Sequence, residues 1–171
     1  MLNPRADIIK SFGAALSGLS YDGNTIPVYA STPQKAPDSL YIFIGTVTTN
    51  ETGCKDVFGH DGSIDIQIID NSKRNYATPE DIEEVTTLVL DTIKSTTTSV
   101  VSMTNHEMIW LTLANTLNDV TLFDTSYAPR NILTFNFEIT ETLADPCANW
   151  IMANDYWNDS GYWLTNCTWP A

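Results

Sequence analysis

The sequence predicts an α+β fold, in which a mixed or antiparallel sheet of about four to six strands is packed by two helices. Two segments carry apolar residues at helical spacing, one near the N-terminus and one at the centre of the chain. Other segments alternate apolar and polar residues, which is the period of a half-buried strand. Neither period continues beyond residue 142. We therefore predict one α+β domain over residues 1–142 and an irregular, tryptophan-rich extension over residues 143–171.

The N-terminal helix is expected to begin at Pro4, because Asn3 can cap it and proline suits the first helical position. Gly18 is the expected stop. Six apolar residues fall on one face of this helix and form its expected buried stripe: Ile8, Ile9, Phe12, Ala15, Leu16 and Leu19.

The central helix is expected to start after Thr78, which can cap it, with Pro79 at its first position. Glu80 and Asp81 occupy its first turn, where the helix dipole favours negative charge. The segment from Lys94 to Ser99 ends it. Its expected buried stripe consists of Ile82, Val85, Leu88, Val89 and Ile93.

Three strands are predicted before the central helix. The turn at residues 21–24 leads to a short strand at 26–30, which Pro27 confines to a sheet edge because proline cannot donate a ladder hydrogen bond. The segment 40–47 is apolar on both faces at its start, which suits a central strand. Residues 48–61 are polar and contain glycines, so we expect a long loop or arm there. The strand at 63–69 follows it.

The second half of the sequence predicts three more strands. Residues 107–113 and 119–124 are expected to be separate strands joined by a turn at 115–118, and residues 130–140 form the closing strand. Residues 100–103 fit either a brief strand or an extended connection. The residues expected to join the strands to the central helix in the core are Ile42, Ile44, Ile66, Ile68, Leu88 and Phe135.

The C-terminal extension is unusually aromatic for its length. It holds four of the five tryptophans, and its only charged residues are three aspartates. Exposing such a segment to water is costly, so we expect it to pack on protein, with stacking on sugars or bases as the alternative. The candidate interface residues are Trp150, Tyr156, Trp157, Tyr162, Trp163 and Trp169.

The sequence shows little reactive chemistry. His60 is interpreted as a loop histidine, because the only other histidine, His106, is distant and the spacing does not match a zinc motif. Asp56, Asp61 and Asp65 lack the spacing of a calcium loop and are read as a solvated acidic loop. No nucleophile motif is present. We therefore expect no enzyme, and no catalytic, cofactor or metal site.

Composition limits the partners of the chain. Its 171 residues include 21 acidic and 8 basic side chains, and the net charge is −13. Such a chain does not bind DNA or an anionic membrane through its overall field. The charge serves solubility, or it lines a passage that DNA crosses without sticking. No window approaches the roughly 18 apolar residues of a membrane span. The cysteine count is odd, so reduced thiols are expected, with a Cys147–Cys167 bridge as the alternative.

The order of elements resembles the tail-completion and tail-terminator proteins of tailed bacteriophages and the related neck proteins. Their P…Y-I-x-I-G strand is matched by Pro37 to Gly45, and their G-x-I-x-I-x-I strand by Gly62 to Ile68. The loop at residues 70–72, the helix after Thr78 and an alternating strand from Arg130 to Ile139 follow in the same order. The resemblance covers roughly residues 3–140. The tryptophan-rich extension and the longer arm at 48–61 depart from it.

The resemblance implies a structural virion protein without catalysis, assembled in the cytoplasm of a bacterial host. It implies a homomeric ring at the head–tail junction, six-fold with twelve-fold as the alternative, in contact with portal, adaptor or tail proteins. Genomic DNA would pass through the ring without specific binding, and no membrane is involved. The rival hypothesis is a carbohydrate- or receptor-binding module that uses the aromatic extension.

Overall fold

The computed structural model describes residues 3–33, 37–52, 59–71, 79–94, 101–123 and 126–142. They belong to one compact unit, Met1–Glu141. Its elements are, in order, α1 (Pro4–Leu16), β1 (Ser20–Tyr21), β2 (Asn24–Thr25), β3 (Val28–Tyr29), β4 (Leu40–Glu51), β5 (Gly59–Asp70), α2 (Pro79–Lys94), β6 (His106–Phe123) and β7 (Ser126–Glu141).

Five strands form one sheet in the order β3-β4-β5-β7-β6, and β1 pairs with β2 in a separate hairpin. β3 is parallel to β4, while the other neighbours are antiparallel, so the sheet is mixed. This arrangement confirms the predicted α+β class and the edge position of the strand that follows Pro27. The predicted turn is confirmed as well, since Asp22 and Gly23 both have positive φ.

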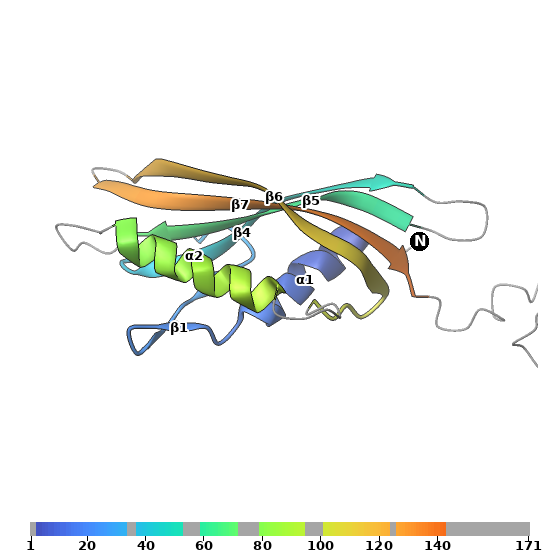
Figure 1. Cartoon of the computed structure of the whole chain (residues 1–171), viewed down its shortest axis with the longest axis horizontal. Helices are drawn as coiled ribbons and strands as arrows, with labels where there is room; N and C mark the ends of the chain where they lie inside the picture. The colour runs from blue at the N-terminus through green and yellow to red at the C-terminus, as the bar shows by residue number, and fades with distance from the viewer. Residues whose placement is uncertain are drawn as a thin grey trace, which may run out of the picture. The chain divides into compact units, whose positions relative to one another are not determined.

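Both helices lie on the same side of the sheet (Figure 1). Asn3 caps α1 as predicted, because its side chain accepts a hydrogen bond from the backbone N–H of Arg5. Pro79 begins α2, while its expected cap, Thr78, lies outside the described residues. Tyr21 of β1 donates a hydrogen bond of 2.9 Å to Asp81, which ties the small hairpin to the first turn of α2.

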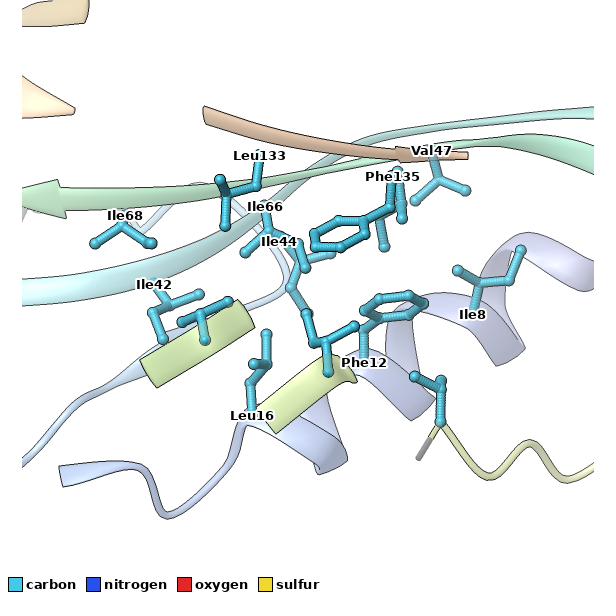
Figure 2. Close-up of a cluster of buried hydrophobic side chains, with 14 of the residues drawn as sticks. Ile8, Phe12, Leu16, Ile42, Ile44, Val47, Ile66, Ile68, Leu133 and Phe135 are labelled. Carbon is cyan, nitrogen blue, oxygen red and sulfur yellow. The ribbon is translucent and has the colours of Figure 1, made fainter. Parts of the chain in front are cut away.

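The core lies between the helices and the strands β4, β5 and β7 (Figure 2). Phe12 and Leu16 of α1 meet Ile44 and Phe135 there, in a layer from which water is excluded. Five of the six predicted core residues are buried, and the sixth, Leu88, is only partly buried. Leu88 lies at the margin of the helical stripe whose centre is formed by Ile82, Val85, Val89 and Ile93.

The prediction of a long loop at residues 48–61 was wrong. β4 continues to Glu51 and β5 starts at Gly59, so that Thr48 to Glu51 pair with His60 to Ser63. A register shift between Ile44 and Val47 returns Val47 to the core opposite Ile64. Two of the four residues beyond it are threonines, whose branched side chains favour strands even when they are polar. The alternation of apolar residues therefore ended before the strand did.

The prediction of two strands at 107–113 and 119–124, with a turn at 115–118, was also wrong. β6 is one strand of 18 residues that pairs with β7 along its whole length. Register shifts occur between Met108 and Trp110 and between Leu113 and Asn115. After each shift, the side chains point to the face opposite to the one that strict alternation would give them. The alternation of apolar and polar residues in the sequence is therefore interrupted at these two points. Residues 101–105 form no strand, so the extended connection was the correct alternative.

Candidate functional site

The predicted aromatic interface lies outside the described residues, as do Asp56 and the three cysteines. The candidate sites of the described part are therefore two features of the sheet itself. One is the side of β4, β5, β7 and β6 opposite the two helices, which we call the helix-free face. The other is a group of buried histidines on the helix-covered side, at the end of the sheet where β7 terminates.

The register of the strands determines which side chains share the helix-free face. Asp65 of β5 lies opposite Thr134 of β7, and Thr134 donates a hydrogen bond of 2.8 Å to its carboxylate. Asp61 thus belongs to a strand, which corrects its interpretation as part of a loop, while Asp65 lies in the strand predicted at 63–69. Arg130 is the basic residue of this face. The acidic residues placed on it by the register are Asp61, Asp65, Glu107, Asp119 and Glu138.

Arg130 is held by two neighbours on the helix-free face. Its guanidinium donates hydrogen bonds to Gln67 of β5, at 3.4 Å, and to Asp119 of β6, directly opposite in the register. The hydrogen bond from Arg130 lowers the pKa of Asp119. Tyr41 is buried on the same face with Ile69 and Ala128, and burial raises the pKa of its phenol. The face is therefore a fixed, largely polar surface around one arginine.

The outer strand β6 exposes apolar side chains. It is the last strand in the sheet order, so its outer edge has no strand partner within the described ranges. Eighteen residues of strand extend about 60 Å, which is a long edge to leave uncovered. The large apolar residues exposed along it are Ile109 (54 %), Trp110 (41 %), Leu117 (50 %) and Val120 (55 %). By the register, Trp110 and Leu117 belong to the helix-free face and Val120 to the opposite face, so exposed apolar side chains lie on both sides of this strand. A long edge strand with exposed apolar side chains marks a surface for protein contact.

The opposite edge of the sheet differs from β6. β3 has only two residues and pairs with Ile42 and Phe43. The remaining part of β4, from Ile44 to Glu51, therefore has no outer strand partner in the part of the chain that the structure describes. The sheet thus presents two unlike edges, one long and apolar and the other short and rich in threonine.

The histidines, which the sequence separates by 46 positions, come together in the fold. His60 is on β5 and 4 % exposed, while His106 is the first residue of β6 and 2 % exposed. Their ring centroids are 6.2 Å apart. His60 is therefore a buried strand residue, which corrects its interpretation as a loop histidine. No sequence spacing could reveal this pair, because strand pairing through β7 creates it.

Asp7 of α1 completes the polar cluster. Its carboxylate lies 2.9 Å from Nδ1 of His106 and accepts hydrogen bonds from the backbone N–H groups of Thr104 and Asn105. Burial favours a raised pKa for Asp7, but these hydrogen bonds outweigh it, and the pKa is lowered. Asp7 is therefore ionised and directs the Nδ1–H of His106 toward itself. Sequence reasoning missed Asp7, which looked like an ordinary first-turn acid of the helix.

Two pockets of the described part are poor in reactive groups. One, of about 240 Å³, lies between α2 and the β6–β7 pair, where Glu83 accepts hydrogen bonds from Asn118 and Asn131. The other, of about 400 Å³, lies beside α1 and is lined mainly by glycine, small and apolar residues such as Gly13 and Ile26. Neither pocket contains a nucleophile next to a base. Neither helix of the described ranges is long and apolar enough to cross a membrane.

No protein-family model matches the chain, and the comparison with curated proteins finds no match. Its fold is similar to that of a protein chain in the solved virion of a native gene transfer agent (GTA) particle. The TM-score is 0.54 and the sequence identity is 13 %, and the match covers 80 % of this chain and 93 % of that chain. A likeness at this identity establishes a shared fold.

Proposed function

We propose that the chain is a structural protein of a phage-like virion, and that it forms a homomeric ring at the head–tail junction as a tail terminator, neck or connector protein. The observation that carries the proposal is the shared fold with a chain of the GTA virion, which extends over 93 % of that chain. The element order from α1 to β7 supports it, because the same order led to the resemblance with tail-completion and neck proteins.

The two unlike edges of the sheet support a ring. A ring is a head-to-tail assembly, so each subunit needs two different patches that fit each other. The apolar edge of β6 and the open part of β4 provide two such patches on opposite sides of one subunit. In this assembly β6 of one subunit packs against the β4 side of the next, and the long edge is no longer exposed.

The charge of the helix-free face supports a position beside DNA. Five carboxylates and one arginine share this face with threonine and asparagine side chains and with the apolar residues Trp110, Leu117 and Ile132. A surface of this charge repels the phosphate backbone, and its one basic residue, Arg130, is already paired with Asp119. The helix-free face therefore suits the wall of a channel that DNA crosses without binding. In this role the chain needs no catalytic residue.

The test uses lysine substitutions on the apolar edge. Ile109→Lys and Leu117→Lys place charges on exposed positions of β6, so the folded subunit should keep its circular dichroism and melting temperature. Ring formation and incorporation into particles should fall, as measured by native mass spectrometry and by the protein content of purified particles. The matched control is Thr87→Lys, an exposed position on α2 and not on a sheet strand.

Electron microscopy of the particles gives the decisive result. We expect rotationally symmetric density for this chain between the portal and the tail. A single copy without rotational symmetry would contradict the proposal. Binding of the isolated chain to a glycan array, lost in a Trp157→Ala variant, would instead favour the carbohydrate-binding hypothesis.

A further inference from the structure

We propose that His60, His106 and Glu141 form a binding site for a transition-metal ion, most suitably Zn²⁺, in which Asp7 positions one of the ligands. One ligand atom from each of the three residues lies within 4.8 Å of the others. The proposal rests on this geometry alone and is independent of the proposed ring.

Strand pairing explains why these three residues meet. His60 lies opposite Ile139 on β7, and His106 lies opposite Glu141, two residues further along the same strand. Side chains two residues apart on a strand point to the same face, so all three side chains project to the helix-covered side. They come from three adjacent strands, β5, β7 and β6, at the end of the sheet.

The buried nitrogen atoms indicate a missing partner. Nε2 of His60 and Nε2 of His106 are both buried and have no hydrogen-bond partner among the described residues. Buried polar atoms in native proteins are almost always paired, so two unpaired nitrogens in adjacent rings call for an explanation. A metal ion between them would accept both lone pairs at once, whereas a hydrogen bond between the rings would require one of them to carry its proton on Nε2.

Asp7 prepares His106 as a ligand. Its carboxylate binds Nδ1–H of His106 at 2.9 Å, so the proton resides on Nδ1 and the lone pair on Nε2. Carboxylate–histidine–metal arrangements of this kind are the usual support for histidine ligands. Asp7 is itself fixed by the backbone N–H groups of Thr104 and Asn105, and this leaves the imidazole little freedom to rotate.

The donor set selects the class of metal. Two imidazoles and a carboxylate suit Zn²⁺ and its neighbours in the transition series, whereas Ca²⁺ and Mg²⁺ require oxygen ligands. Ligand atoms around tetrahedral zinc are about 3.3 Å apart. The present separations, up to 4.8 Å, therefore require a modest contraction on binding. The bound ion would join three strands and, through Asp7, the N-terminal helix, at the point where β7 ends.

The site runs against the sequence-based expectation of no metal, which considered only spacing along the chain. It is testable with the full 171-residue chain, stripped with a chelator and titrated with Zn²⁺ by calorimetry. We expect one ion per chain. A hundred-fold excess of free Zn²⁺ over the Kd should raise the melting temperature by roughly 5–10 °C.

Variants separate this site from other sources of zinc affinity. His60→Gln, His106→Gln and Glu141→Gln should each abolish or greatly weaken binding, and Asp7→Asn should weaken it about 10- to 100-fold. Glu107→Gln is the matched control, since Glu107 neighbours His106 but projects to the helix-free face. A variant with Cys54, Cys147 and Cys167 replaced by serine should bind as the native chain does.

A second measurement does not depend on the folding of variants. Co²⁺ bound to the native chain should give the absorption bands of a tetrahedral nitrogen–oxygen site without thiolate charge-transfer bands. The proposal is overturned if the chain shows no saturable one-to-one binding. Thiolate bands, or unchanged affinity in His60→Gln, would overturn it as well.

Discussion

Arg130 of β7 lies directly opposite Asp119 of β6, and its guanidinium donates a hydrogen bond to the Asp119 carboxylate on the helix-free face. The same guanidinium reaches Gln67 on β5. One side chain therefore connects three neighbouring strands. The connection is partly exposed to water, so its strength depends on pH and salt.

The first prediction concerns the pH dependence of this ion pair. The hydrogen bond from Arg130, followed by one from the backbone N–H of Val120, holds the pKa of Asp119 below its ordinary value of 3.8. A lowered folded-state pKa stabilises the fold above the unfolded pKa, and the stabilisation is lost as pH falls through the folded-state pKa. Asp119→Asn should therefore lower the melting temperature by a constant amount near neutral pH. The difference should shrink below pH 3.8 and vanish once the pH is below the folded-state pKa.

Thermal unfolding of both proteins from pH 7 to pH 2 checks this expectation. High salt should reduce the difference at neutral pH, because an exposed pair is screened. A difference that persisted at pH 2 would show that the asparagine acts through packing and not through charge.

The second prediction concerns two core positions. Phe135 is 1 % exposed at the centre of the core, so Phe135→Ala should cost about 3–5 kcal/mol of unfolding free energy. Leu88 is only partly buried, so Leu88→Ala should cost less than the roughly 2–5 kcal/mol of a fully buried leucine. Urea denaturation measures both values. Equal costs would show that the margin of the α2 stripe is packed as tightly as its centre.

The third prediction concerns Gly62. In the structure it lies inside β5, and a Cβ atom built on it would be 2.0 Å from the carbonyl oxygen of Thr48. Gly62→Ala must therefore push β4 away from β5 and should destabilise the fold by roughly 1–3 kcal/mol or more, as overpacking does. Chemical denaturation at constant pH measures the loss. A neutral result would mean that the two strands can separate at this point without cost.

Gly13 provides the fourth prediction and a contrast to Gly62. It lies within α1, and a Cβ atom there would be at an ordinary contact distance of 3.6 Å from the side chain of Ile44. Alanine is a better helix former than glycine, so Gly13→Ala should stabilise the fold by about 0.5–1 kcal/mol. The same denaturation experiment measures the gain. A loss of stability would indicate that the added methyl group lies closer to the Ile44 side chain than 3.6 Å.

Local patterns predicted the elements whose apolar period was unbroken. Asn3 and Pro4 predicted the start of α1, and Pro79 predicted the start of α2. The alternating isoleucines of β5 predicted which face of that strand is buried. Where a register shift interrupted the period, as at Asn115 in β6, the same reasoning split one strand into two. A shift of one residue exchanges the faces of a strand, and a single sequence does not reveal which partner forces it.

The buried histidine cluster could not be predicted for a different reason. Asp7 and His106 are 99 positions apart and meet only because α1 packs against the end of the sheet where β6 begins. His60 joins them through pairing with Ile139 of β7, which is also distant along the chain. The one available signal was that both histidines of the sequence lie beside strands rich in apolar residues. Tertiary contacts of this range leave no periodic mark on the sequence.

The last prediction concerns the aromatic extension, whose role as an interface remains a prediction. The core residues, from Ile8 to Ile139, all belong to the unit Met1–Glu141. Deleting residues 145–171 should therefore leave the α+β unit folded, with a cooperative transition and unchanged helix and strand content by circular dichroism. Incorporation into particles should fall, because four tryptophans that each bury roughly 150–250 Å² would be lost from a protein contact.

Two variants make this experiment decisive. Replacing Trp150, Trp157 and Trp163 by serine in the full chain removes the aromatic anchors but keeps the length of the extension, and it should reduce incorporation as strongly as the deletion does. Replacing the three aspartates of the extension by asparagine is the control, which should leave incorporation unchanged if aromatic packing provides the contact. A deletion variant that fails to fold would show that the extension belongs to the core, since the sheet and its two helices would then be unable to bury their apolar faces alone.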